Sequence, residues 1–137
     1  MKTIFCDIDG TLLKFREDFS SMMNYADPLK GVIQTLTEWH IKGYKVILVT
    51  GRPEPFRKRT EEQLLEVGIV YDQLVMGVGS GPRYLINDET PQGEQTAYSI
   101  NVVRNEGLSP DMLEKDIDEV LEEKGDDFSA YYDKVFY

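Results

Sequence analysis

The sequence predicts an α/β fold, in which a mainly parallel, five-stranded sheet lies between two layers of helices. Short β-rich runs alternate with helical patterns along the chain, and parallel strands need crossover connections that cover the sheet with helices. The apolar runs also end on polar residues, as expected where parallel strands bring their carboxyl ends to one edge. With 137 residues, of which 41% are hydrophobic, the chain is long enough for one domain with a real core.

Five short runs are predicted to be strands because they are rich in β-branched, aromatic and other apolar residues and lie between turn signals. They cover residues 3–7, 45–50, 73–76, 84–87 and 99–103.

The first predicted helix follows the first strand and has clear signals at both ends. Apolar residues from Leu29 to Trp39 recur at helical spacing. Asp27 suits the N-cap, Pro28 suits the first helical position, and Gly43 follows the end.

Two further helices are predicted between and after the later strands. Residues 54–67 form one, with Phe56, Leu64 and Val67 facing inward and a stop before Gly68. Residues 109–125 form the other, which is acidic on its outer face. We therefore expect one domain over residues 1–137, with its core in 1–105 and an acidic helix and aromatic tail in 106–137.

Composition restricts the partners and the location. Fifteen Lys and Arg residues face 25 Asp and Glu residues, so the net charge is −10, which repels nucleic-acid backbones without excluding a local basic cleft. No stretch reaches the ~20 apolar residues of a membrane span, and the start lacks a leader pattern. With Cys6 as the lone cysteine, we expect a cytoplasmic protein and a thiol that packs in the core.

Three predicted strand ends carry polar groups, at residues 7–9, 50–52 and 87–89. Asp7 and Asp9 are two residues apart, so in a regular strand both carboxylates point the same way and repel each other. A hard cation such as Mg²⁺ resolves that repulsion, and Asp88 offers a further carboxylate at the same edge. The alternative is that Asp7 and Asp9 only cap the turn into Gly10 and Thr11.

These segments resemble the motifs of a known family. DIDGT after an apolar strand resembles the first motif of the haloacid dehalogenase superfamily of phosphotransferases. ILVTGR resembles its second motif, and PRYLINDE resembles its third and fourth. The resemblance spans residues 1–90 and implies a Rossmann-like three-layer sandwich of the family's small, capless type.

The resemblance also implies roles for the two first acids. Asp7 would be the nucleophile that forms an aspartyl-phosphate, which divides one difficult hydrolysis into two easier steps. Asp9 would be the general acid for the leaving oxygen and then the base for water. Mg²⁺ would be held by the Asp7 side chain, the Asp9 backbone carbonyl and Asp88.

Phosphate contacts are expected from the same loops. Thr50 would donate a hydrogen bond to a phosphoryl oxygen, and backbone N–H groups near Gly10, Thr11 and Gly51 would add donors. Gly51 would let the backbone pass close to the phosphate. For Arg52, contact with the substrate and a place in the cleft wall stay open as alternatives.

The third and fourth motifs depart from the family pattern. Lysine is usual in the third motif, whereas this stretch offers only Arg83, which can bind phosphate bidentately but differs from lysine in geometry. Asn87 stands where a second acid is common, so Asp88, or else Glu89, would carry the charge near the metal.

Neither gap between motifs is long enough for a cap domain, which predicts an open site. An open site suits a large or extended phosphorylated substrate, or a small one covered by a neighbouring subunit of a homo-oligomer. The preferred reading is a Mg²⁺-dependent phosphomonoesterase that acts on a small sugar phosphate or nucleotide. Three alternatives stay open: an enzyme like polynucleotide 3′-phosphatases, a phosphotransferase or phosphomutase, and a module that binds a phospholigand without catalysis.

Overall fold

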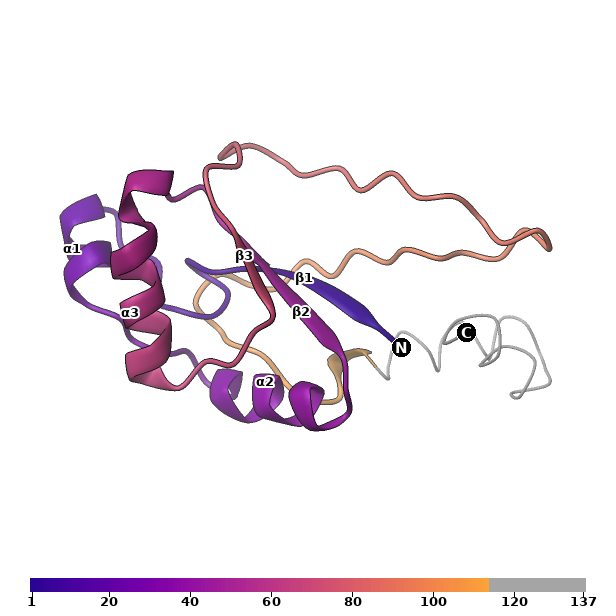
Figure 1. The fold of residues 1–137 in the computed structure, drawn as a ribbon, viewed down its shortest axis with the longest axis horizontal. Coiled ribbons are helices and arrows are strands. Elements are labelled where there is room, and N and C mark those ends of the chain that lie inside the picture. Colours follow the sequence, from indigo (N-terminus) through magenta and orange to yellow (C-terminus); the bar gives the residue numbers. More distant parts are fainter. Residues whose placement is uncertain (114–137) are drawn as a thin grey trace.

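The structure, a computed structural model, describes residues 1–113 of the chain. Its sheet has three parallel strands (Figure 1). The elements in chain order are β1 (Thr3–Asp7), α1 (Phe19–Asn24), α2 (Val32–Ile41), β2 (Lys45–Val49), the short 3-10 helix η1 (Glu54–Phe56), α3 (Arg57–Val67) and β3 (Gln73–Val75).

The strand order in space, β1-β2-β3, follows the order in the chain. Cys6 of β1 is level with Leu48 of β2, which is level with Leu74 of β3. Because both crossovers run in the same direction across the sheet and are expected to be right-handed, their helices belong on the same face. The α/β prediction is confirmed, while the predicted helix layer on the second face is not found among the elements of residues 1–113.

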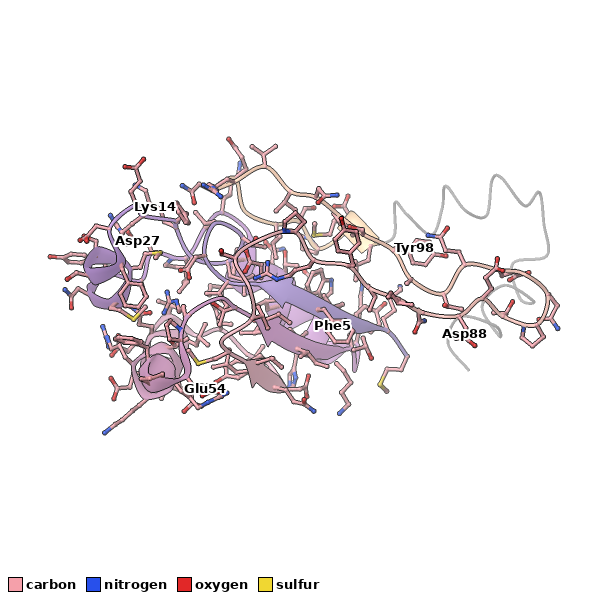
Figure 2. All side chains as sticks on the ribbon, turned by 90° about the horizontal axis from the view of Figure 1, so that it is seen from above. Phe5, Lys14, Asp27, Glu54, Asp88 and Tyr98 are labelled. Atoms are coloured by element: carbon pink, nitrogen blue, oxygen red, sulfur yellow. The ribbon has the colours of Figure 1, made fainter. Side chains whose placement is uncertain are left out.

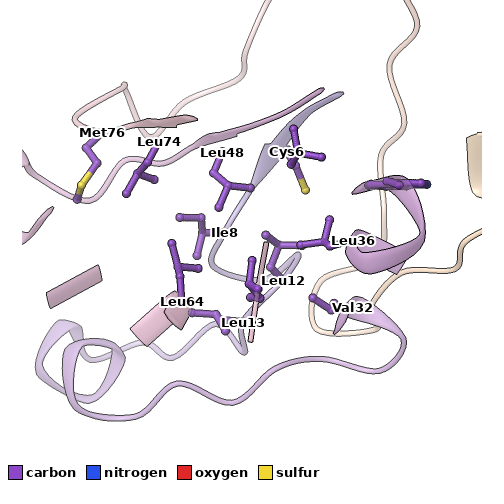
Figure 3. Close-up of a cluster of buried hydrophobic side chains, with 13 residues drawn as sticks. Cys6, Ile8, Leu12, Leu13, Val32, Leu36, Leu48, Leu64, Leu74 and Met76 are labelled. Atoms are coloured by element: carbon purple, nitrogen blue, oxygen red, sulfur yellow. The ribbon is translucent and has the colours of Figure 1, made fainter. Parts of the chain in front are cut away.

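The core fills the space between that face and the helices (Figure 3). Alternate strand residues point to it, among them Cys6, Val46, Leu48 and Leu74, which are buried. Leu36 and Trp39 of α2 and Leu64 of α3 are almost inaccessible and belong to the same cluster. On the opposite face Phe5 is exposed.

Helix α2 begins four residues later than Pro28, so the predicted start is wrong. Residues 28–31 instead make a turn against the loop after β1, where the Leu29 N–H donates to the Leu12 carbonyl at 2.9 Å. Gly31, with a left-handed φ of 74°, is the actual N-cap. The contact with the loop after β1 overrides the helix-start signal of Asp27 and Pro28, because it gives the Leu29 N–H a hydrogen-bond partner without a helical turn.

The second predicted helix is confirmed as η1 followed by α3, which ends at Gly68 in the left-handed conformation. Leu64 is buried and Val67 packs on the core, as predicted. Phe56 is partly exposed and instead meets the Phe19 ring edge to face. Helix α1 was not predicted; its signal is Asp18, whose carboxylate accepts from the Ser21 backbone N–H.

The predicted strands 84–87 and 99–103 are wrong for this structure. Residues 79–103, here called the projecting segment, leave the body as two extended arms (Figure 1) and have no regular secondary structure. Cross-arm bonds occur near the turn, where Asn87 donates to the Thr96 hydroxyl at 2.8 Å. Tyr84 and Ile86 are 89% and 93% exposed, since none of the three described strands lies beside them.

The predicted helix 109–125 lies mostly outside the described residues, as does the aromatic tail. Only its first residues are described, with Met112 and Leu113 packed against the core. Within the described part of the chain, the helices are all too short or too polar to cross a membrane.

Candidate active site

Asp7 is the last residue of β1 and has an accessible carboxylate. Its side chain is 37% exposed, and its Oδ1 lies 3.7 Å from Nη1 of Arg83. Burial raises the pKa of Asp7 above its ordinary value, while Arg83, the Ile8 backbone and Arg104 act in the opposite direction. The resulting group is a partly desolvated carboxylate beside cations, which suits a nucleophile toward an anionic phosphorus centre.

Asp9 has a very different environment from Asp7. Its side chain is 14% exposed, and its Oδ2 and Oδ1 accept hydrogen bonds from Nε and Nη2 of Arg52 at 2.9 and 2.7 Å. This bidentate pairing fixes the plane of the Asp9 carboxylate. It leaves Asp9 oriented at the edge of the site rather than free to rotate.

Arg52 is buried and continues the network into α3. Its Nη1 donates to Oγ1 of Thr60 at 3.1 Å and to Oε1 of Gln63 at 2.6 Å. Gln63 in turn donates to the backbone carbonyls of Met22 and Met23, both at 2.8 Å. Arg52 is therefore held between Asp9 and α3, where it orients the Asp9 carboxylate.

The loop after Asp9 is a tight turn. Gly10 has a φ of 91°, in the region that favours glycine. The N–H groups of Thr11, Leu12 and Leu13 all donate to the Ile8 carbonyl, and the Gly10 N–H donates to Leu13 at 2.7 Å. In this structure the N–H groups of Gly10 and Thr11 thus donate within the turn itself, and their predicted role as phosphate donors stays a prediction.

Thr50 and Gly51 lie where β2 ends, next to β3. The Thr50 side chain is buried, and its hydroxyl oxygen accepts from the Arg52 backbone N–H at 3.1 Å. Because that hydroxyl is used as an acceptor, its proton is still available for donation. A Cβ on Gly51 would lie 3.3 Å from the Val78 carbonyl oxygen, so the glycine does permit a close backbone approach.

The structure does not bring Asp88 to Asp7 and Asp9. Asp88 and its neighbours Asn87 and Glu89 lie out on the projecting segment (Figure 2). The reason is that residues 84–87 do not pair with β1, so their carboxyl end is not at the sheet edge. Within residues 1–113, no three or more His, Cys, Asp or Glu side chains form a metal-binding group.

Sequence reasoning missed Arg104 and Asn105, which lie beside Gly10. The Asn105 N–H donates to the Gly10 carbonyl at 2.8 Å, and its Oδ1 accepts from the Phe15 N–H at 2.7 Å. The Arg104 guanidinium lies 4.2 Å from the centre of the Phe15 ring. Both residues directly follow the apolar run 99–103, so the rule on polar strand ends could have found them.

A magnesium ion is compatible with only part of the expected set of ligands. Asp7 ends β1 and Asp9 follows two residues later, so the Asp7 carboxylate and the Asp9 carbonyl come from one short stretch, whereas the third acid is missing from this place among the described residues. Mg²⁺ commonly uses one or two protein carboxylates and completes its shell with substrate phosphate and water. The two residues present fit a metal bound in that way.

Comparison with known families gives a match over nearly the whole chain. The family of haloacid dehalogenase-like hydrolases matches residues 4–137. Among curated proteins, no sequence matches this chain significantly.

Solved structures with a related fold include a structural-genomics target from Vibrio cholerae, which is 20% identical, with a TM-score of 0.51 over 90% of this chain and 99% of that chain. It supports the fold. A chain of a Pnkp1/Rnl/Hen1 complex is 31% identical over 61% of this chain and 30% of that chain, with a TM-score of 0.49. The D,D-heptose 1,7-bisphosphate phosphatase from B. bronchiseptica, complexed with magnesium and phosphate, is 20% identical over 58% of this chain and 52% of that chain, with a TM-score of 0.45. The match thus spans about half of the phosphatase and less than a third of the chain from the Pnkp1/Rnl/Hen1 complex.

Proposed function

Because the chain belongs to the family of haloacid dehalogenase-like hydrolases, we propose that it is a phosphomonoesterase with Asp7 as its nucleophile. The observation that carries this proposal is the contrast between the two acids. Asp7 is accessible and lies beside Arg83, whereas both oxygens of Asp9 are held by Arg52. One carboxylate is open to attack a phosphorus atom, and the other is fixed beside it.

In the first step, a carboxylate oxygen of Asp7 forms a bond to phosphorus while the bond from phosphorus to the ester oxygen breaks. Asp9 gives a proton to that leaving oxygen, so an alcohol departs. In the second step, Asp9 takes a proton from water, the water oxygen bonds to phosphorus, and the bond to Asp7 breaks. The products of the second step are inorganic phosphate, the free Asp7 carboxylate and the protonated Asp9, which is ready for the next cycle.

The proton on Asp9 must coexist with the Arg52 pairing. We propose that Arg52 keeps the carboxylate plane fixed so that one oxygen faces the leaving group. Arrival of a phosphate dianion beside Asp7 favours the protonated form of Asp9, because another negative charge is added at the site.

Cations and the Thr50 hydroxyl would bind the phosphoryl oxygens. Arg83 lies 3.7 Å from Asp7 and is exposed enough to exchange that contact for the substrate. The Thr50 hydroxyl has a proton to donate. Arg83 thus takes the place of the usual lysine, with a planar group that can bind two oxygens at once.

The Asp7 side chain and the Asp9 backbone carbonyl are the groups that would hold Mg²⁺. When bound, the metal would neutralise the repulsion between the carboxylate and the substrate phosphate. Asp88 is not proposed as a ligand in this arrangement, since it lies on the projecting segment.

Small phosphorylated metabolites, such as sugar phosphates or nucleotides, are the proposed substrate class. A net charge of −10 disfavours long nucleic acids. A small substrate needs only the local cations around Asp7, which outweigh the general repulsion at short range.

The test is release of inorganic phosphate from a panel of phosphorylated metabolites and short oligonucleotides, with Mg²⁺ and with a chelator. The proposal predicts release that needs Mg²⁺ and falls by at least about a thousandfold in Asp7→Asn. Lys58→Ala is the matched control, because Lys58 is exposed on α3 and its loss should leave release unchanged. Release that persists in Asp7→Asn would contradict the proposal.

One observation favours a second candidate, a phospholigand-binding module without catalysis. Both oxygens of Asp9 are engaged by Arg52, and the described residues lack the third acid of a metal site. Saturable binding of phosphorylated compounds without any turnover, with Mg²⁺ present, would support this candidate. A phosphorylated product formed from an added sugar would instead indicate a phosphotransferase.

A further inference from the structure

Arg104 is held beside the first motif by contacts of its own side chain and of the next residue, Asn105. Asn105, which has a left-handed φ of 65°, bonds to Gly10 and Phe15 as described above. A Cβ built on Gly10 would lie 3.3 Å from Cγ of Arg104, so the arginine stem lies directly over the turn that follows Asp9.

The segment after Arg104 is anchored a second time. The Leu108 N–H donates to the Lys30 carbonyl at 2.9 Å. A Cβ on Gly107 would lie 2.0 Å from that same carbonyl oxygen, and a Cβ on Gly31 would lie 2.2 Å from the Leu108 oxygen. Such close packing on two separate loops fixes residues 104–108 to the body, so Arg104 is held beside the site.

The Arg104 guanidinium is exposed and lies over the Phe15 ring. Among the residues that the structure describes, it has no hydrogen-bond or ion-pair partner. The other two arginines of the site are engaged: Arg52 with Asp9 and Arg83 with Asp7. Arg104 is therefore the arginine of this site that has no carboxylate partner among the described residues, so its donors are available to a further anionic group.

Arg104 lies at the rim of the candidate site and not beside the Asp7 carboxylate. Arg83 is within 3.7 Å of an Asp7 oxygen, while Arg104 influences Asp7 more weakly than Arg83 does and rests on Gly10 and Phe15 instead. A phosphoryl group on Asp7 would thus meet Arg83 first. The guanidinium of Arg104 would face a part of the substrate that extends outward from that phosphoryl group.

We propose that Arg104, stacked on Phe15, is a specificity-determining residue that binds a second anionic group of the substrate, such as a second phosphate. The inference rests on the proposed function for the position of the first phosphate. Stacking on an aromatic ring limits the rotamers of the guanidinium, which lowers the entropy lost when it binds an anion. Substrates with two anionic groups are accordingly preferred over those with one.

The test compares matched mono- and bisphosphates of one hexose and of one nucleoside. Their dissociation constants are measured by calorimetry with full-length Asp7→Asn protein, in which turnover is blocked. The proposal predicts that the bisphosphate of at least one pair binds about tenfold more tightly than its monophosphate. Adding Arg104→Ala should weaken both ligands but weaken that bisphosphate about tenfold more.

Two further variants separate a local contact from general electrostatics. Arg104→Lys keeps the charge but loses the planar fork, so only part of the preference should remain. Lys58→Ala removes one charge from α3 and should leave the preference intact. Thermal midpoints of all variants show whether each one folds.

The inference is overturned if the Asp7→Asn protein shows no preference for the bisphosphate. It is also overturned if the preference survives Arg104→Ala, or if it falls by the same factor in Lys58→Ala. The proposed function is tested independently of this inference, because its test measures phosphate release by the protein that keeps Asp7. Loss of turnover with the preference retained would contradict catalysis and still support Arg104 as an anion-binding residue.

Discussion

At the residue scale, two carboxylates of the same type lie in different environments. Asp7 remains accessible at the end of β1, while the mostly buried Asp9 is paired with an arginine that has further bonds to Thr60 and Gln63. The motif alone could predict that both acids are important. It could not predict the Arg52 pairing, because Arg52 follows Asp9 by 43 residues of chain and its further partners Thr60 and Gln63 come later still.

Arg52→Ala should destabilise the protein strongly, because it leaves the mostly buried Asp9 carboxylate without its partner. We expect a loss of about 3–5 kcal/mol in the free energy of unfolding, measured by urea denaturation. Lys58→Ala is the matched control, since Lys58 is exposed on α3 and its loss should change the free energy of unfolding far less. Equal losses in the two variants would contradict the Arg52 network.

Cys6 should be unreactive in the folded protein. Burial raises the pKa of its thiol to about 12, so the native thiol stays protonated at about pH 9, where an unfolded thiol with a pKa of about 8.5 is mostly ionised. The stability that comes from this difference is fully present below the unfolded pKa and is lost as the pH rises through the folded one. Alkylation followed by mass spectrometry should label Cys6 only after denaturant is added; rapid labelling of native protein would show that the thiol is accessible.

At the element scale, the sequence predicted the parts with strong local signals. Strands β1, β2 and β3 and the end of α3 lie within about one residue of their predicted bounds, because apolar runs and a terminal glycine are local patterns. The start of α2 was wrong, since residues 28–31 bond to the loop after β1 instead of forming a helical turn. Strands 84–87 and 99–103 were wrong because pairing depends on a partner, which a run of β-branched residues does not specify.

The close contact between residues 104–108 and the 30–31 turn makes Gly107 a sensitive position. Gly107→Ala should cost more than about 3 kcal/mol in the free energy of unfolding, because its Cβ would lie 2.0 Å from the Lys30 carbonyl oxygen in addition to the strain at a φ of 87°.

Gly68→Ala isolates the effect of backbone strain. Gly68 has a similar φ of 85° but nothing within 4 Å of a built Cβ, so its replacement should cost only about 1 kcal/mol. Chemical denaturation of both variants measures the difference. Similar costs would mean that residues 104–108 are not packed against the Lys30 turn.

At the scale of the whole molecule, the site lies where several chain segments meet. The projecting segment departs just after Val78, whose N–H donates to the Thr50 carbonyl at 3.1 Å, and it returns at Arg104 and Asn105 beside Gly10. Both of its ends are therefore at the candidate site, although its middle extends away from the body (Figure 1). The position of Asp88 follows from this path and could not be read from its motif.

Among the described residues, a protease should cut the exposed arms of the projecting segment first. Trypsin is expected to cleave after Arg83, because residues 83–86 are extended and exposed, whereas Lys58 is protected within α3. Mass spectrometry of early digestion products identifies the order of cleavage. Cleavage after Lys58 before cleavage after Arg83 would contradict the described path of the segment.

The central claim is that Asp7 receives the phosphoryl group. The most direct measurement is mass spectrometry of protein that has been quenched with acid during turnover of a phosphomonoester found in the panel. If Asp7 receives the phosphoryl group, the peptide that contains Asp7 should gain one phosphoryl group. This adduct should be cleaved by hydroxylamine, as acyl phosphates are, and should be absent from Asp7→Asn. Turnover without any such adduct, or an adduct on another residue, would contradict it.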